Sequence, residues 1–176
     1  MERAELIRRV RQTAYLEGDF VLRSGRRSRY YLDKYLFETQ PDILGELGKL
    51  LADYVTEHTT RIAGAELGGV PLAAATSLAC GKPYVIIRNT RKDYGTQKLF
   101  EGVLEKGDRV LLLEDVVTSG GQVLEAARII TEAGAQVERI VAVIDRQEGG
   151  GAAITAAGYP FAALLTAADL GVGTGA

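Results

Sequence analysis

The residues that could carry chemistry are concentrated between Val110 and Gln122, where an apolar run leads into two acids and then into hydroxyls and glycines. The run Val110–Leu113 predicts a buried parallel strand, and open α/β sheets bind their ligands beyond the carboxyl ends of such strands. We therefore expect Glu114 and Asp115 at the rim of a sheet. Carboxylates in that position could hold sugar hydroxyls or a divalent cation.

The residues after the acidic pair can form a phosphate site. Thr118 and Ser119 bring two hydroxyls, Gly120 and Gly121 let backbone N–H groups turn toward one point, and a helical pattern follows directly. A helix N-terminus attracts anions because its first N–H groups are free and its dipole is positive there. Carboxylates beside such a cradle fit phosphoribosyl pyrophosphate (PRPP). A turn and capped helix without a ligand is the alternative, although two adjacent acids are costly there unless solvated or paired.

Two glycine-containing segments elsewhere could serve a diphosphate. Residues 88–102 combine four cations with glycines between two predicted strands, which favours a lid that neutralises a leaving pyrophosphate; a solvated hairpin is the alternative. Residues 65–71 follow a strand, and their paired glycines let backbone N–H groups approach an anion. Pyrophosphate is the natural occupant, but an empty tight turn has the same pattern.

Two further groups of residues could bind a planar, acidic base. Arg146 follows a predicted strand, and its guanidinium could hold a carboxylate bidentately, or simply form a salt bridge at the strand end. Aromatic rings and polar groups near the N-terminus suit a base, and they suit packing equally well. These residues are Tyr30, Tyr31, Asp33 and Tyr35.

Alternating patterns predict the elements that position these residues. Helical patterns cover residues 1–15, 41–54, 71–80 and 122–133, and apolar runs predict strands over 61–65, 84–88, 109–113, 139–144 and 161–165. The alternation predicts a doubly wound, mainly parallel sheet. We expect one domain over 1–176, with an N-terminal hood (1–40, including short strands within 19–37), an α/β core (41–170) and a flexible tail (171–176).

Composition excludes several classes of function. The chain has 176 residues, 47% of them hydrophobic, and a formal net charge of −2, which does not favour nucleic-acid binding. The lone Cys80 excludes an internal disulfide framework and fits the reducing cytoplasm. An apolar run long enough to span a membrane is missing, as is the apolar core of a signal peptide. We therefore expect a cytoplasmic protein without a membrane partner.

The pattern as a whole resembles the orotate phosphoribosyltransferase family of type I phosphoribosyltransferases, especially its haloarchaeal-like branch. The resemblance spans nearly the whole chain and is carried by residues 18–25, 30–39, 92–96, 100–102, 114–122 and 145–148. It implies transfer of the 5-phosphoribosyl group from PRPP to orotate, giving orotidine 5′-phosphate and pyrophosphate in de novo pyrimidine (UMP) synthesis. It also implies Mg²⁺ and a homodimer whose lid, residues 88–102, acts in trans.

The resemblance also implies a role for individual residues. Those at the PRPP site would be Arg88, Lys92, Tyr94, Glu114, Asp115, Val116, Val117, Thr118, Ser119, Gly120, Gly121 and Gln122. Lys92, Asp115 and Arg88 would be catalytic, and orotate would contact Thr118, Arg146, Tyr30, Tyr31 and Arg23. Mg²⁺ would be held mainly by PRPP, near Glu114 and Asp115, without a dedicated protein site.

Three positions depart from the pattern of many bacterial members. Gly68 and Asn89 stand where those members carry lysines, and Tyr94 stands where they carry a histidine. Cations are thus missing on the pyrophosphate side, and Arg91 or Lys98 are candidates to replace them. Two alternative functions remain: a phosphoribosyltransferase for a purine or uracil, which would not need Arg146, and a non-catalytic PRPP-sensing regulator, which would need a nucleic-acid-binding face.

Overall fold

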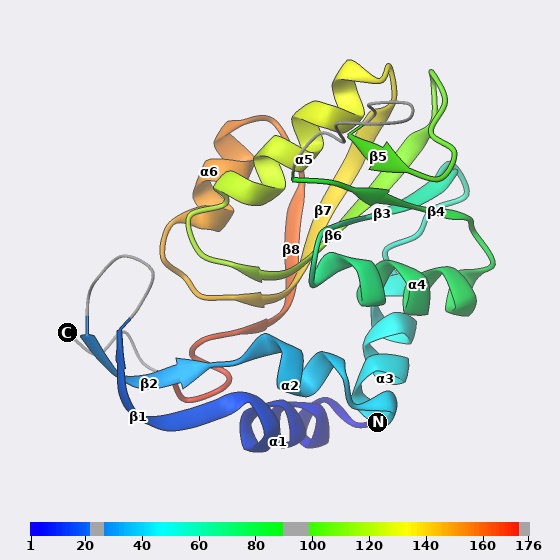
Figure 1. Ribbon diagram of the computed structural model, residues 1–176. Coiled ribbons are helices and arrows are strands. Elements are labelled where there is room, and N and C mark those ends of the chain that lie inside the picture. The colour runs from blue at the N-terminus through cyan, green and yellow to red at the C-terminus, as the bar shows by residue number, and fades with distance from the viewer. Residues whose placement is uncertain (22–26, 90–98, 173–176) are drawn as a thin grey trace.

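The computed structural model describes residues 1–21, 27–89 and 99–172. Its centre is a six-stranded sheet with the order β5-β4-β3-β6-β7-β8 (Figure 1). All neighbouring pairs are parallel except β4 with β5. The strands are β3 (Arg61–Ala65), β4 (Tyr84–Ile87), β5 (Phe100–Glu101), β6 (Arg109–Val117), β7 (Gln136–Asp145) and β8 (Phe161–Thr166). The predicted mainly parallel α/β sheet is confirmed.

Helices cover both faces of this sheet (Figure 1). They are α3 (Pro41–Ala52), α4 (Gly69–Cys80), α5 (Gly121–Glu132) and α6 (Gly150–Ala156). Successive side chains of a strand point to opposite faces, so β6 contributes to two separate cores. Leu111 and Leu113 pack in the cluster that includes residues of α3 and α4, whereas Leu112 packs with residues of α5 and α6. The two cores fix β6 in the middle of the molecule.

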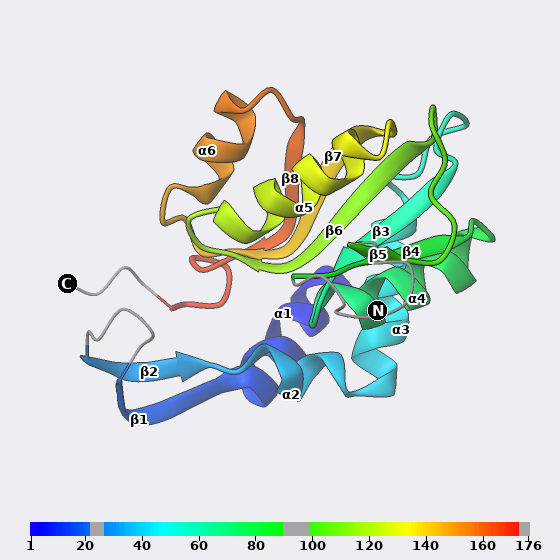
Figure 2. The same cartoon turned by 45° about the horizontal axis from the view of Figure 1, so that its top comes forward.

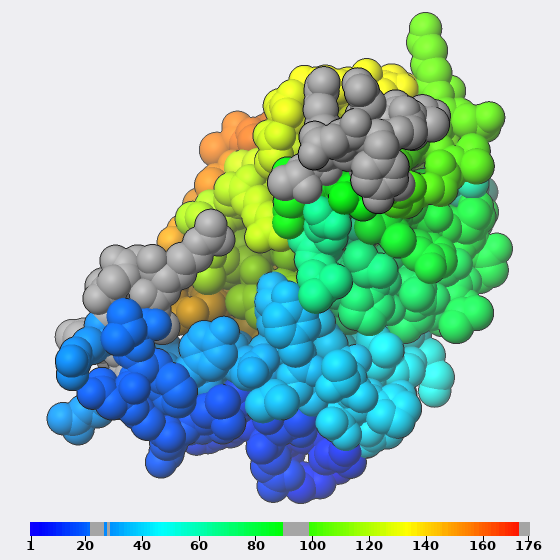
Figure 3. Space-filling view, viewed as in Figure 1, coloured from blue at the N-terminus to red at the C-terminus, as the bar shows by residue number. Residues whose placement is uncertain are grey.

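The N-terminal hood consists of two helices and a two-stranded antiparallel sheet. Its elements are α1 (Arg3–Ala14), β1 (Tyr15–Val21), β2 (Arg27–Leu32) and α2 (Lys34–Glu38). Leu6, Val10 and Ala14 of α1 are buried in the same core as Leu47 of α3, which anchors the hood to the body. Figure 2 shows β1 and β2 extending away from the central sheet, and Figure 3 shows the blue hood lying against the rest of the molecule.

The sequence patterns missed three short elements and misplaced several boundaries. Helices α2 and α6 and strand β5 were not predicted, and residues 34–37 lie in α2 rather than in a strand. Strand β6 continues to Val117, four residues beyond the predicted end at Leu113. Of the predicted tail, Gly171 and Val172 lie within the described range and Val172 is buried in the core, whereas residues 173–176 lie outside that range.

Within the described ranges, none of the helices is both long and apolar enough to cross a lipid bilayer.

Candidate active site

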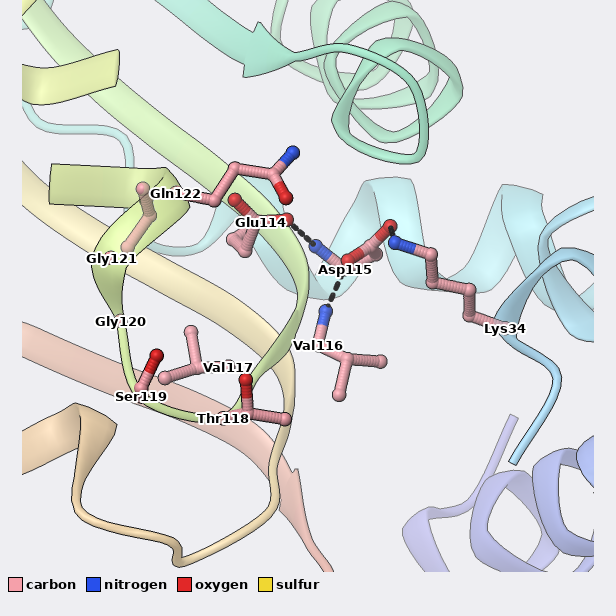
Figure 4. Close-up of a pocket in the computed structure, with 11 residues that line it drawn as sticks. Lys34, Glu114, Asp115, Val116, Val117, Thr118, Ser119, Gly120, Gly121 and Gln122 are labelled. Atoms are coloured by element: carbon pink, nitrogen blue, oxygen red, sulfur yellow. Dashed lines mark hydrogen bonds and ion pairs between the residues drawn. The ribbon is translucent and has the colours of Figure 1, made fainter. Parts of the chain in front are cut away.

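A pocket lies where β6 ends and α5 begins (Figure 4). It is lined by residues from the second half of β6, the loop after it, the first turn of α5 and the hood. These residues are Lys34, Glu114, Asp115, Val116, Val117, Thr118, Ser119, Gly120, Gly121, Gln122 and Val123. The structure therefore brings together the whole predicted run from Glu114 to Gln122 and adds Lys34, which sequence analysis did not select.

The loop between β6 and α5 has the form of an anion cradle, and we call residues 118–122 the phosphate loop. Gly120 has a φ of +81°, which lets the chain turn sharply into α5. The carbonyl of Gly120 accepts the N–H of Leu124, and the N–H groups before it have no acceptor within the helix. A Cβ atom at Gly120 would lie 3.1 Å from the carbonyl oxygen of Gly150, so α6 supports the loop from behind.

The two acids lie within β6 rather than beyond its end, which corrects the predicted position at the rim. Asp115 is fully buried, and Glu114 is 4% exposed. Oδ1 of Asp115 accepts a hydrogen bond from the N–H of Val116 at 2.5 Å, while Oδ2 lies 2.5 Å from Nζ of Lys34. Oε2 of Glu114 has no hydrogen-bond partner among the described residues. Both side chains therefore keep acceptor capacity for a ligand's hydroxyl groups or for a cation.

Lys34 and Glu38 bring two ionisable side chains from the hood to the neighbourhood of Asp115. They are four residues apart on α2, which places them on the same face of the helix. Glu38 is 2% exposed, and neither of its carboxyl oxygens has a hydrogen-bond partner in the described structure. We call Lys34, Glu38, Asp115 and the backbone of Gly68 the charged corner. Gly68 belongs to it because a Cβ atom there would lie 1.6 Å from Oδ2 of Asp115.

The pKa values of Glu38, Glu114 and Lys34 are all raised, for different reasons. Burial, and then the nearby charge of Asp115, raise the pKa of Glu38 to about 8. The same two causes raise the pKa of Glu114 well above its ordinary value. Burial alone would lower the pKa of Lys34, but attraction to Asp115 outweighs it and the pKa is raised. At neutral pH the charged corner therefore holds the Lys34–Asp115 ion pair beside a Glu38 carboxyl group that retains its proton.

Lys34 and Glu38 were not predicted as site residues because the pattern of residues 19–37 indicated strands. The i, i+4 spacing of the two residues was a usable signal, since a helix would have placed them together. Asp115, the ion-pair partner of Lys34, is 81 residues away from it in the sequence. The pairing therefore depends on the tertiary fold, which brings α2 against the second half of β6.

The turn at residues 65–71 connects β3 to α4 and lies beside the pocket. The carbonyl of Glu66 accepts hydrogen bonds from Nδ2 of Asn89 at 2.9 Å and from Nε2 of Gln122 at 3.0 Å. Oε1 of Glu66 accepts the backbone N–H of Asn89 at 2.7 Å. Asn89 thus ties the end of β4 to this turn, and the amide of Gln122 points to the turn rather than toward the phosphate loop.

Arg146 lies at the end of β7, the strand next to β6. Its backbone N–H donates to the carbonyl of Val117 at 3.0 Å, while its guanidinium lies 2.8 Å from Oε1 of Glu148. The side chain is 23% exposed and is not among the residues that line the pocket. The salt bridge considered from the sequence is therefore present.

The remaining candidates lie around the pocket or outside the described residues. Tyr30 stacks on Tyr15 with ring centroids 5.8 Å apart, and Tyr31 is 44% exposed and packs against Phe20. The guanidinium of Arg88 lies 3.5 Å from the carboxylate of Glu101. The candidates outside the described ranges are Arg23, Arg91, Lys92, Tyr94 and Lys98.

Comparisons with known proteins identify relatives of this chain. Residues 37–159 match the model of the phosphoribosyl transferase domain. The chain is 43% identical over 167 residues to an orotate phosphoribosyltransferase of Methanocella arvoryzae, covering 94% of this chain and 95% of the relative. It is 47% identical over 153 residues to that of Halobacterium salinarum, covering 87% of each.

A solved structure gives the same result for the fold. It is the orotate phosphoribosyltransferase of Mycobacterium tuberculosis H37Rv in complex with PRPP, which superposes with a TM-score of 0.79 at 32% sequence identity. The superposition covers 96% of this chain and 98% of that one.

Proposed function

The chain belongs to the orotate phosphoribosyltransferases of the phosphoribosyl transferase family, and we propose how its pocket serves their reaction. The enzyme transfers the 5-phosphoribosyl group from PRPP to orotate, which yields orotidine 5′-phosphate and pyrophosphate in pyrimidine biosynthesis. The observation that carries the proposal is the joint placement of the phosphate loop and the two β6 carboxyl groups around one pocket.

We assign the 5′-phosphate of PRPP to the phosphate loop. The free N–H groups at the start of α5 and the hydroxyls of Thr118 and Ser119 would donate hydrogen bonds to its oxygens. Glu114 and Asp115 would then accept hydrogen bonds from the ribose hydroxyls. Because β6 is held between two cores, the carboxyl groups are positioned before the substrate arrives, and this reduces the entropy that must be lost on the way to the transition state.

The reaction itself needs no covalent bond to the protein. In our proposal a ring nitrogen of orotate attacks the anomeric carbon as pyrophosphate leaves, and positive charge develops on the ribose. Asp115 would orient the ribose, and its negative charge would stabilise the transition state at close range. The protein's contribution is positioning and electrostatics.

Mg²⁺ is the metal that suits this site. Oε2 of Glu114 is buried without a hydrogen-bond partner in the described structure, Oδ2 of Asp115 contacts the Lys34 ammonium, and carboxylate oxygens are ligands that Mg²⁺ accepts. The described residues contain no group of three or more His, Cys, Asp or Glu side chains that could hold a metal ion, and we propose that PRPP supplies most of the ligands. When bound, Mg²⁺ would neutralise charge on the departing pyrophosphate.

We place orotate between the hood and the end of β7. Arg146 already holds the carboxylate of Glu148, and the carboxylate of orotate could take that place in the same geometry. Thr118 would contact orotate from the phosphate loop. Tyr30, Tyr31 and Arg23 would close the base site from the hood.

We further propose that the enzyme is a cytoplasmic homodimer in which the lid at residues 88–102 reaches the neighbouring subunit's site. Arg88, Lys92 and Tyr94 would then stabilise the leaving pyrophosphate in trans. Lys92→Ala should lower kcat by about 100-fold or more without changing the thermal unfolding temperature, because it removes transition-state charge stabilisation alone. Steady-state kinetics and a melting curve check this, and an unchanged kcat would exclude the lid role.

One assay tests the assignment of the reaction. Consumption of orotate should require both PRPP and Mg²⁺, and uracil, hypoxanthine and adenine should remain unused in parallel reactions. If another base reacts while orotate is inert, the assignment is wrong.

A further inference from the structure

At the charged corner, the hood, strand β6 and the turn at residues 65–71 meet at one oxygen atom. Oδ2 of Asp115 lies 2.5 Å from Nζ of Lys34, and the Cβ position of Gly68 would be 1.6 Å from the same atom. A side chain at position 68 would force this carboxylate to move. The turn at residues 65–71 therefore brings no cation of its own to the corner, and an ammonium from α2 lies beside it instead.

Lys34 is also the single cation among the described residues that line the pocket. The other lining side chains are acidic, polar or apolar, so a ligand with several phosphate charges meets only one positive side chain there. Asn89, at the far side of the turn, is a neutral amide that hydrogen-bonds to Glu66. Among the described residues that line the pocket, the positive charge available to a diphosphate therefore comes from Lys34.

The hood holds Lys34 in a defined place. Asp33 begins α2 and accepts the N–H of Tyr35 at 3.1 Å, and Nζ of Lys34 lies 5.3 Å from the centre of the Tyr35 ring. The Lys34 side chain is 29% exposed and lines the pocket, with its ammonium directed at Asp115 (Figure 4). A lysine held this way loses little additional entropy when it binds an anion.

We propose that Lys34 is a substrate-binding residue that supplies the cation for the diphosphate of PRPP. In the free enzyme its ammonium pairs with Asp115. When PRPP binds, the ribose hydroxyls donate to Asp115, and the ammonium contacts diphosphate oxygens at the turn. This inference rests on the proposed function, since it assumes that the diphosphate lies at residues 65–71. It gives Lys34 the role for which Arg91 and Lys98 were the sequence-based candidates.

Binding of three ligands to Lys34 variants tests the proposal. Isothermal titration calorimetry with PRPP, inorganic pyrophosphate and ribose 5-phosphate, each with Mg²⁺, separates the diphosphate from the ribose and the 5′-phosphate. For Lys34→Met we expect about 10- to 100-fold weaker binding of PRPP and pyrophosphate, the usual effect of losing a charge-assisted hydrogen bond. Ribose 5-phosphate should bind within about 2-fold of wild type, and Lys34→Arg should restore most of the diphosphate affinity.

Two controls make each outcome decisive. Lys34→Gln keeps a hydrogen-bond donor for Asp115 but removes the charge, so it replaces Lys34→Met if that variant does not fold. It should also bind PRPP and pyrophosphate more weakly and ribose 5-phosphate normally. Lys49→Met removes a 73%-exposed lysine that pairs with Glu46 and should change nothing. An equal loss for all three ligands would mean that Lys34 only neutralises Asp115, and no loss would exclude any binding role; either result overturns the proposal. Wild-type turnover of orotate tests the proposed function separately.

Discussion

The phosphate loop and the charged corner lie on two sides of one pocket and are built in different ways. The phosphate loop is five consecutive residues whose N–H groups, hydroxyls and glycines follow from local chain geometry, and none of them carries a charge. The charged corner joins residues of α2, the turn after β3 and strand β6 through a buried ion pair. The loop therefore acts through backbone shape, whereas the corner acts through charges that only the fold brings together.

This difference predicts how each region fails. A backbone cradle is damaged by substitutions that change φ or fill space behind it, and it changes little with pH. A buried charged corner is damaged by any substitution that moves one of its residues or removes the partner of a charge. The charge that remains is then buried without a partner, which destabilises the fold. Substitutions on the two sides should therefore give different signatures in binding, turnover and pH dependence.

Gly68→Ala should have the largest effect. Its methyl group would lie 1.6 Å from Oδ2 of Asp115, so the carboxylate must move away from Lys34 and from the ribose. We expect kcat/KM to fall about 100- to 1000-fold, the usual cost of misplacing a transition-state contact. Affinity for inorganic phosphate should stay near wild type, since the phosphate loop is untouched. Steady-state kinetics and phosphate titration measure the two effects.

Gly45→Ala is the matched control for this substitution. Gly45 lies in α3 and a Cβ atom there meets nothing within 4 Å, so the variant should keep full activity. If Gly68→Ala lowers phosphate affinity as strongly as kcat/KM, the two regions are not separate.

Glu38→Gln should alter the pH dependence of stability. Because the pKa of Glu38 is raised from 4.5 to about 8 in the folded state, the folded protein keeps a proton that the unfolded chain releases. This contribution is fully present below pH 4.5 and is lost as the pH rises toward 8. The free energy of unfolding should therefore fall by about 2 to 4 kcal/mol more in wild type than in Glu38→Gln over that range.

Denaturant unfolding of both proteins at several pH values measures this difference. Comparing slopes rather than absolute values removes the fixed cost of the amide that Glu38→Gln introduces. Glu57→Gln, at an 87%-exposed side chain, should leave the wild-type slope unchanged. Parallel curves for wild type and Glu38→Gln would mean that Glu38 is ionised in the folded protein at neutral pH.

The same difference explains what could be predicted from the sequence. The parallel sheet and the phosphate loop could be predicted from the sequence because apolar runs, glycines and hydroxyls act at short range along the chain. The charged corner could not be predicted, because Lys34 and Asp115 come into contact only after α2 packs beside β6. Helix α6 has few large apolar residues and so lacks a clear stripe, and the burial of Asp115 inside β6 depends on pairing with a distant lysine.

Gly120→Ala should have the smallest effect and should be confined to the phosphate side. An alanine at φ +81° costs about 1 to 2 kcal/mol, and its methyl group would lie 3.1 Å from the carbonyl of Gly150. To relieve the backbone strain and the close contact with Gly150, the phosphate loop must shift away from α6. This shift disturbs the N–H groups that face the phosphate. We expect about 10-fold weaker binding of inorganic phosphate and of PRPP, with kcat at saturating PRPP nearly unchanged.

Gly107→Ala separates backbone strain from damage to the loop. Gly107 has a φ of +88° and open space around its Cβ position, so the variant should lose similar stability but keep phosphate affinity. The pH dependence of unfolding in Gly120→Ala should match wild type, because Glu38 and Lys34 are not touched. A changed pH slope in Gly120→Ala would show that loop geometry and corner charge are coupled through β6, and the division between a backbone-built and a charge-built side of the pocket would then fail.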